Sequence, residues 1–224
     1  HIVKSTPSNR TIFFGMDQGS AELNSSNVKG KNPFADKRVR LAMYHSLDME
    51  AIKDKVMRGQ SAPAGIITAP GINGHTPERD QRFAYDPELS KKLLVEAGYP
   101  DGFELTLDCP NDRYINDEAI CVAAIGMFAK IGVTVNLDAK TKSQHFSEVK
   151  EGDANGMTSD MYMLGWGVPT FDSEYVYSYL FESSGSWNKV NFSNARVDEL
   201  VASMKVETDL DKRNAMIAEA WDIT

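Results

Sequence analysis

Two patterns of apolar and polar positions run along the chain, and they predict strands and helices in alternation. A strand is indicated where apolar and polar residues alternate, or where a short apolar run lies between turn residues. These patterns predict four strands, over residues 11–16, 103–108, 133–137 and 161–164.

Helices are indicated by apolar residues at helical spacing and by residues that start or stop a helix. Asp86-Pro87-Glu88 combines an N-cap, a proline and an acidic residue at a helix start, and this helix is expected to end at Gly98. In the expected helix 36–47, one face carries Val39, Ala42, Met43 and Leu47. Further helices are expected over residues 49–57, 116–130, 143–151, 173–181, 195–206 and 210–222.

The order of these elements predicts an α/β fold. Strands and helices alternate through the middle of the chain, which indicates a mixed or parallel sheet with helices packed on it. Asp48, Asn194 and Asp209 are expected to cap the helices that follow them. Residues 60–80 are rich in proline and are expected to form an irregular, extended loop.

The segment 161–172 is expected to organise the ligand-facing edge of the sheet. Residues 161–164 read as a buried central strand, after which Gly165, Gly167 and Pro169 are expected to break the ladder. Ligands of open α/β sheets bind beyond the carboxyl ends of the strands. Trp166 is therefore a candidate stacking platform for a ligand, although the residues fit a core tryptophan equally well.

Asp172 is expected to cap the aromatic helix 173–181. Asp172 and Glu174 form a carboxylate pair in the first turn, where the helix dipole stabilises acidic side chains. That structural role is favoured over an acid–base pair. The aromatic side chains of this helix, Tyr175, Tyr177 and Tyr179, are expected to lie near the exposed face of the cleft.

A second candidate loop, Pro110 to Tyr114, directly follows the strand 103–108. Arg113 offers a planar charged fork suited to a carboxylate or phosphate, and Tyr114 offers a rigid aromatic face. Alone, this loop also fits a turn with an exposed arginine. Two such loops at strand ends together indicate one half of a ligand cleft.

The bulk composition narrows the class of protein. The 224 residues are 42% hydrophobic and 25% charged, with a net charge of −8, which is ordinary for a globular protein and argues against a nucleic-acid partner. No apolar run approaches the roughly 18–20 residues needed to span a bilayer. The first residues carry no signal-peptide pattern and the last ones stop within a helical pattern, so we expect both ends to be cut from a longer chain.

No motif in the sequence supports catalysis, a metal or a cofactor. The four histidines are scattered without metal-ligand spacing, and neither a nucleophile elbow nor a phosphate loop is present. Gly165-Trp166-Gly167 lacks the third glycine of a dinucleotide fingerprint. The two cysteines, Cys109 and Cys121, fit no zinc or CxxC pattern, and the residues alone leave open a disulfide or two buried thiols.

Several blocks of sequence, in order, resemble the extracytoplasmic solute-binding proteins of family 5, the peptide- and nickel-binding components of ABC importers. The resemblance runs from about residue 32 to the end. It rests on Asn32-Pro33-Phe34-Ala35-Asp36-Lys37-Arg38-Val39-Arg40-Leu41-Ala42, Leu47-Asp48, Tyr85-Asp86-Pro87, residues 93–103, Lys130-Ile131-Gly132-Val133 and Gly165-Trp166.

The resemblance implies a type II periplasmic-binding-protein-like fold with two lobes that close around a ligand. Residues 32–224 would form the C-terminal lobe and residues 1–31 a hinge-proximal strand and loop, with the N-terminal lobe missing. It also implies export to the periplasm, a membrane permease as partner, and capture of a peptide or a related oligomeric or anionic solute without catalysis. Export to an oxidising compartment favours a disulfide between Cys109 and Cys121.

One departure from the family pattern bears on the ligand. Peptide binders of the family carry an Asp three residues after the Trp, which pairs with the peptide ammonium, and here that position is Pro169. Asp172 matches a second aspartate of the family motif, which is more general than the first. The block from Pro110 to Tyr114 resembles the subset that includes glutathione-type binders.

The expected ligand-binding residues are Trp166, Gly167, Arg113, Tyr114 and Asp172. We expect an anionic or polyhydroxylated solute, or a peptide with a blocked amine. Two alternatives remain at this point: a hydrolase or transferase acting on a similar solute through Asp172 and Glu174, and a receptor or chaperone built on the same scaffold.

Overall fold

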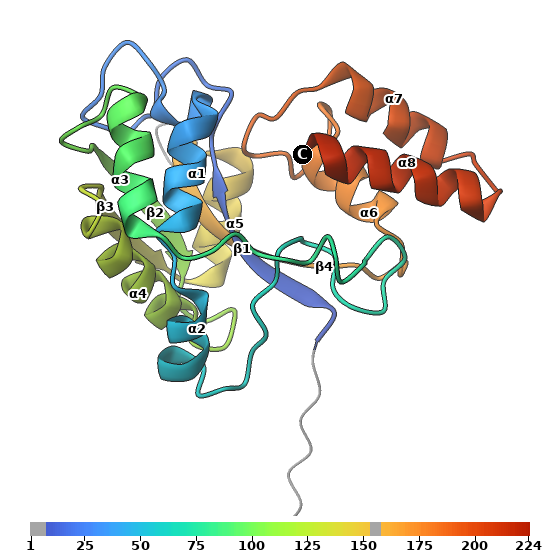
Figure 1. The fold of residues 1–224 in the computed structure, drawn as a ribbon, viewed down its shortest axis with the longest axis horizontal. Coiled ribbons are helices and arrows are strands. Elements are labelled where there is room, and N and C mark those ends of the chain that lie inside the picture. The colour runs from blue at the N-terminus through green and yellow to red at the C-terminus, as the bar shows by residue number, and fades with distance from the viewer. Residues whose placement is uncertain (1–7, 153–157) are drawn as a thin grey trace, which may run out of the picture.

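A four-stranded mixed sheet forms the centre of the molecule in the computed structural model, which describes residues 8–152 and 158–224. The strand order is β1-β4-β2-β3. β4 pairs antiparallel with β1, whereas β2 runs parallel to both β3 and β4 (Figure 1). The strands are β1 (Arg10–Met16), β2 (Glu104–Pro110), β3 (Thr134–Lys140) and β4 (Met161–Gly167). The predicted α/β class and all four predicted strands are confirmed.

The alternation of side chains along β4 divides the interior into two apolar layers. Met161 and Met163 point into a core with β2, β3, α1, α3 and α4, while Tyr162, Leu164 and Trp166 point into a second core with α5 and α6. Both sides of this strand are buried, as its continuous apolar run predicts.

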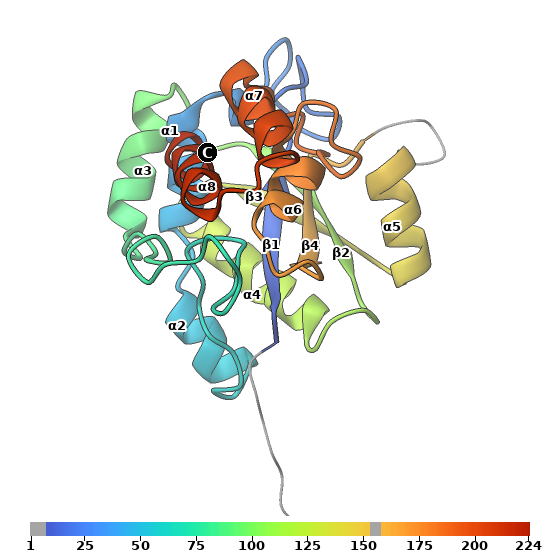
Figure 2. The same cartoon turned by 90° about the vertical axis from the view of Figure 1, so that its right-hand side faces the viewer.

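Helices cover both faces of the sheet. In Figures 1 and 2, α1, α3 and α4 lie on one side, and α5 and the C-terminal helices lie on the other. The helices are α1 (Lys37–His45), α2 (Met49–Ala51), α3 (Pro87–Glu96), α4 (Asp117–Ala129), α5 (Lys142–Glu151), α6 (Glu174–Val176), α7 (Ala195–Met204) and α8 (Leu210–Ile223). Shorter helical segments are η1 (Pro33–Ala35), η2 (Ile52–Val56) and η3 (Tyr177–Phe181).

Side-chain caps fix the starts of these helices where the sequence predicts them. The carboxylates or amides of Asp48, Asp86, Asn194 and Asp209 accept hydrogen bonds from backbone amides in the first turn. Leu47 lies just beyond the end of α1, yet it still packs against the same core. Residues 49–57 form α2 followed by a π-helical turn rather than one α-helix.

Two predictions for the segment 161–181 are wrong. Gly165 and Gly167 do not break the ladder, because β4 continues to Gly167 and Gly165 pairs with Ile12 of β1. Asp172 is not the N-cap of the following helix, because Ser173 takes that position, although the Asp172 carboxylate still accepts a hydrogen bond from the Glu174 amide at 2.9 Å. The predicted helix 173–181 is present, and in it α6 passes into the π-helical turn η3 after Val176.

A third apolar cluster joins η3 to α7 and α8. It contains Tyr177, which is fully buried and contacts the ring of Trp221 at 5.0 Å between centroids. Of the three tyrosines expected near the exposed face of the cleft, Tyr177 is therefore buried and does not line the cleft. It occupies the buried side of η3, whereas Tyr175 and Tyr179 lie toward solvent.

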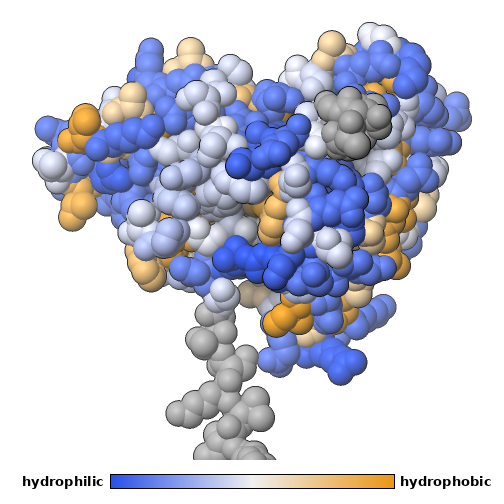
Figure 3. Space-filling model, turned by 180° about the vertical axis from the view of Figure 1, so that it is seen from behind, coloured by the Kyte–Doolittle hydropathy of each residue, from blue (hydrophilic) through white to orange (hydrophobic). Residues whose placement is uncertain are grey.

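The surface opposite the view of Figure 1 is mostly hydrophilic, with scattered apolar residues (Figure 3). None of the helices in the described part of the chain has the length and apolar character that crossing a bilayer requires. β1 is an edge strand of the four-stranded sheet. Its proximity to a hinge between two lobes stays a prediction.

Candidate ligand-binding cleft

A cleft of about 710 Å³ lies at one edge of the sheet, where β2 and β4 end and the antiparallel β1 begins. Its lining comes from β1, the loop after β2, α5, the end of β4 and the segments that follow. The described lining residues are Asn9, Arg10, Arg113, Tyr114, Phe146, Ser147, Lys150, Glu151, Leu164, Gly165, Trp166, Gly167, Val168, Pro169, Tyr175 and Trp187. The cleft brings together four of the five predicted binding residues, all except Asp172.

Tyr114 packs directly over the glycine in the middle of β4. The Gly165 amide donates a hydrogen bond to the Tyr114 hydroxyl oxygen at 2.8 Å. A Cβ at position 165 would lie 2.7 Å from Tyr114 Cε1 and 2.5 Å from Ile12 Cδ1, so only glycine fits this approach. Burial raises the pKa of Tyr114, despite the opposing hydrogen bond from Gly165, so its hydroxyl keeps its proton at neutral pH.

Arg113 extends its guanidinium along the aromatic wall of the cleft. Its Cζ lies 4.9 Å from the centroid of the Tyr114 ring and 5.9 Å from that of Phe146. Among the described residues, no carboxylate forms an ion pair with this guanidinium. The side chain therefore presents unpaired donors on an aromatic support.

Trp166 combines the two roles that its sequence context leaves open. Its side chain belongs to the second apolar core and is only 8% exposed, yet it also lines the cleft. Its ring contacts those of Tyr175, Tyr179 and Trp187 at 5.7, 5.7 and 6.2 Å between centroids. Its indole nitrogen is buried and has no hydrogen-bond partner among the described residues.

The described lining carries an excess of positive charge, although the chain as a whole is acidic. Arg10, Arg113 and Lys150 line the cleft, against the single carboxylate of Glu151. Arg10 also donates a hydrogen bond from Nη1 to the Gly165 carbonyl oxygen at 2.8 Å. Sequence reasoning missed Arg10 because only the antiparallel pairing of β1 with β4 brings the start of β1 to this edge.

The sequence also did not indicate three other residues of the cleft lining, Lys150, Phe146 and Trp187. Lys150 and Phe146 stand on α5, whose cleft-facing side has no distinct pattern in the sequence, and Trp187 lies in the irregular segment after η3. Nothing in the spacing of these residues marks them as neighbours of Trp166.

Asp172 lies outside the cleft, in an ion pair with α8. Its carboxylate accepts hydrogen bonds from Arg213 Nε at 3.0 Å, from Arg213 Nη2 at 2.9 Å and from Asn73 Nδ2 at 3.0 Å. Burial opposes ionisation, but these bonds outweigh it and hold the pKa of Asp172 below its ordinary value. Glu174 accepts a hydrogen bond from the Ser178 hydroxyl. These contacts give both carboxylates structural partners and form no acid–base pair.

A cluster of three carboxylates beside α5 has the spacing of a cation site, but a lysine already fills it. Oxygen atoms of Asp108, Asp138 and Glu148 lie within 4.8 Å of one another. Lys140 Nζ pairs with all three, at 2.9 Å from Asp108 and 2.7 Å from Asp138. Burial disfavours its charge, yet these contacts raise the pKa of Lys140 overall, so the cluster is an ion-pair network around a buried lysine.

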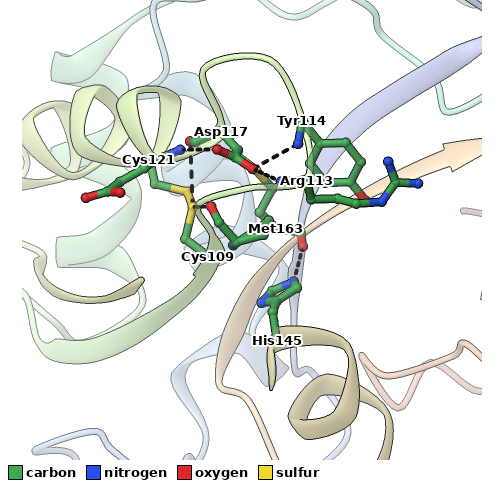
Figure 4. The surroundings of a disulfide bond; sticks show 9 residues. Cys109, Arg113, Tyr114, Asp117, Cys121, His145 and Met163 are labelled. Carbon is green, nitrogen blue, oxygen red and sulfur yellow. Dashed lines mark hydrogen bonds between the residues drawn. A yellow bond between two sulfur atoms is a disulfide. The ribbon is translucent and has the colours of Figure 1, made fainter. Parts of the chain in front are cut away.

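Cys109 and Cys121 are joined in a disulfide below the loop that carries Arg113 and Tyr114 (Figure 4). Both residues are fully buried. Nearby, His145 is also buried, and its Nε2 lies 2.8 Å from the Met163 carbonyl oxygen. Burial lowers the pKa of His145, which keeps it neutral.

The mixed sheet with helices on both faces has the fold of the type II periplasmic-binding-protein class. Comparison with known protein families makes the assignment specific. The chain belongs to the bacterial extracellular solute-binding proteins, family 5 (middle region), whose family model matches residues 2–188. This is a family of solute-binding proteins rather than enzymes, so the hydrolase or transferase alternative finds no support.

Among curated proteins, the chain is similar to the glutathione-binding protein GsiB of Salmonella typhimurium, with 29% identity over 203 residues. That match covers 89% of this chain and 39% of the relative, so the chain spans about two fifths of that protein's length.

Two solved structures show the same fold. The dipeptide-binding protein of Pseudoalteromonas sp. SM9913 in complex with Met-Leu has a TM-score of 0.80 and 24% identity, covering 96% of this chain and 41% of that one. The binding protein AgaA of A. tumefaciens R10 in complex with agropinic acid has a TM-score of 0.79 and 22% identity, with the same coverage.

Proposed function

We propose that this chain is the greater part of the C-terminal lobe of a periplasmic solute-binding protein that delivers its ligand to an ABC importer. The ligand would lie between this lobe and a second lobe, and a membrane permease would receive it. Family membership and the position of the cleft at the carboxyl edge of the sheet support this role.

The Arg113 guanidinium carries the proposal: it lies on the aromatic wall of the cleft and has no ion-pair partner among the described residues. An arginine held against tyrosine and phenylalanine rings presents a planar fork with few internal partners. That arrangement suits a ligand carboxylate or phosphate, which accepts two parallel hydrogen bonds from the fork.

The ligand class follows from the balance of charges and donors. Arg10, Arg113 and Lys150 outnumber the lone carboxylate of the described lining, and Tyr114 keeps a hydroxyl proton to donate. We propose an anionic solute, such as an acidic or amine-blocked peptide or a polyhydroxylated acid. GsiB is named for binding glutathione and AgaA was solved with agropinic acid, and these names fit that class.

Calorimetry on the full-length protein tests the proposal with three probes: glutathione, agropinic acid and the dipeptide Met-Leu. We expect at least one of the two acids, glutathione or agropinic acid, to bind more tightly than Met-Leu. Arg113→Gln should weaken that binding by about tenfold to a hundredfold, because charge-assisted hydrogen bonds contribute about 1.5–3 kcal/mol.

The matched control is Arg196→Gln, because Arg196 pairs with Glu199 and Glu219 on the exposed face of α7 and α8, far from the cleft lining. Arg196→Gln should leave binding unchanged. Equal loss in both variants, or tight binding of Met-Leu with none of the acids, would refute the proposed ligand class.

A further inference from the structure

The loop that carries Arg113 and Tyr114 is held at its base by a covalent bond. Cys109 lies near the end of β2 and Cys121 lies in α4, so their disulfide ties together the two elements that the loop connects. Their Cα atoms are 6.7 Å apart. Both cysteines are fully buried, so neither can touch a ligand in the cleft.

A buried carboxylate holds the same loop from inside. Asp117 is only 4% exposed, and its Oδ2 accepts hydrogen bonds from the Arg113 and Tyr114 amides, each at 2.9 Å (Figure 4). Its Oδ1 accepts a third hydrogen bond, from the Glu118 amide at 3.0 Å. Among the described residues, no cation forms an ion pair with Asp117. Its partners are backbone amides, so the carboxylate stabilises the backbone conformation of the loop.

The outer side of the loop is the part that faces the cleft. There the Tyr114 hydroxyl meets the Gly165 amide, and the Arg113 guanidinium lies against the Tyr114 ring. The disulfide and Asp117 therefore act on the cleft only through the backbone of Arg113 and Tyr114. They are positioning residues in this arrangement.

We propose that the Cys109–Cys121 disulfide and Asp117 set the ligand affinity of the cleft by holding Arg113 and Tyr114 in their binding positions before the ligand arrives. This inference rests on the proposed function, because it takes Arg113 and Tyr114 as ligand contacts. A preformed site avoids the entropic cost of ordering a loop during binding, so the gain appears as affinity.

The test compares three variants of the full-length protein: Cys109→Ala/Cys121→Ala, Asp117→Asn and Val201→Ala. Val201 is fully buried in the cluster of α7 and α8, away from the cleft lining, so it controls for a general loss of stability. Two measurements are made on each variant. One is amide hydrogen exchange over residues 110–117, and the other is calorimetry with glutathione as the probe.

We expect the double cysteine variant and Asp117→Asn each to speed exchange at residues 111–116 by about tenfold or more, while the strands keep their protection. Glutathione affinity should fall by a similar factor in both, because the loop must then be ordered during binding. Val201→Ala should lower the melting temperature without changing either measurement. Because hydrogen exchange at residues 111–116 reports on the loop itself, it distinguishes a variant that loosens the loop from one that only destabilises the whole fold.

Unchanged exchange over residues 111–116 in the double cysteine variant would overturn the inference, whatever glutathione does. So would faster exchange with undiminished glutathione affinity. If glutathione fails to bind even the unmodified protein, the ligand class of the proposed function is what fails, and the exchange measurement still decides whether the disulfide and Asp117 hold the loop.

Discussion

The Gly165 amide donates a hydrogen bond to the Tyr114 hydroxyl at 2.8 Å, and this contact joins the loop after β2 to the middle of β4. Gly165 was expected to interrupt the strand. It is instead the residue that lets an aromatic ring rest on a continuous strand, because a Cβ there would collide with both Tyr114 and Ile12. The loop after β2 and the strand β4, which carries Trp166, are thus in direct contact.

Gly165→Ala is expected to destabilise the protein by about 1–3 kcal/mol, because the added methyl must displace Tyr114 and Ile12 in a packed region. Urea unfolding measures the change. The control is Gly126→Ala on α4, where a Cβ meets nothing within 4 Å and the backbone is helical. That variant should gain up to about 1 kcal/mol from helix propensity. Equal effects at the two positions would contradict this account of Gly165.

Much of the fold could be predicted because the strands and helix starts depend on local patterns. The run Met161 to Leu164 is apolar at every position, and both of its faces are in fact buried. Asp86 and Asn194 are caps whose side chains bond to amides two or three residues ahead. Such interactions depend on a few neighbouring residues, so the sequence displays them directly.

The cleft could be predicted only where its residues follow a parallel strand. Arg113 and Tyr114 follow β2, and Trp166 is the last residue but one of β4, so a single rule places all three at the same edge. Arg10 reaches that edge only through antiparallel pairing over a separation of 155 residues. Asp172 was misplaced because its partner, Arg213, lies 41 residues away in α8. Long-range pairs of this kind have no local pattern.

Asp172→Asn tests whether that ion pair supports the fold. Because the pKa of Asp172 is held below its ordinary value of 3.8, its contribution is present at neutral pH and is lost as the pH falls through the folded pKa. We expect a loss of about 1–3 kcal/mol at pH 7.

Urea unfolding of both proteins between pH 7 and pH 3 measures this difference, which should stay constant down to about pH 4 and shrink below it. Asp222→Asn is the control, since Asp222 is an exposed partner of Arg79, and it should change stability less. A difference that grows toward low pH would contradict the assigned role of Asp172.

Lys140→Met should leave the carboxylates of Asp108, Asp138 and Glu148 without their shared cation. Removing one partner of a fully buried pair typically costs about 3–5 kcal/mol, and we expect a smaller loss here because Asp138 is exposed. Millimolar Ca²⁺ should restore part of the melting temperature, because these oxygens lie close enough to share a cation.

Wild-type protein is the first control for that experiment, since Lys140 already occupies the position between the three carboxylates and Ca²⁺ should have no effect on it. Lys53→Met is the second, because Lys53 pairs with Glu50 at the surface and its loss should matter little. A Lys140→Met protein as stable as wild type would show that the network contributes little to the fold.

The disulfide also has a consequence for stability apart from binding. Protein produced in an oxidising compartment should contain no free thiol by mass measurement under non-reducing conditions. The double variant Cys109→Ala/Cys121→Ala should lose about 3 kcal/mol of unfolding free energy in the chain-entropy account of so short a loop. Two free thiols in periplasmically produced protein would contradict the bond.

Pro169→Asp is expected to change the ligand preference of the cleft. Pro169 lines the cleft and stands three residues after Trp166, where peptide binders of the family carry an aspartate for the ligand ammonium. In this chain an ammonium near that position has only Glu151 among the described lining, and Glu151 is exposed, so pairing there gains little. A carboxylate placed at residue 169 should contribute about 1–3 kcal/mol to binding an ammonium, or roughly tenfold to a hundredfold in affinity. The position tolerates the change sterically, because Pro169 is exposed and is the second residue of a turn closed by the Phe171 amide and the Val168 carbonyl.

Calorimetry with Met-Leu and its amine-acetylated form measures this gain on the full-length protein. Pro169→Asp should bind free Met-Leu more tightly than wild type does, and acetylation should abolish the difference, because the acetylated amine carries no charge to pair. Thr170→Asp adds the same charge one residue along, at a position outside the cleft lining, and should give no such gain. Wild-type protein that binds free Met-Leu at submicromolar affinity and loses it on acetylation would show that the cleft already holds an ammonium partner, and the assignment of an anionic ligand would then fall. Equal gains in Pro169→Asp and Thr170→Asp would show instead that overall charge, rather than a partner placed beside Trp166, sets the preference.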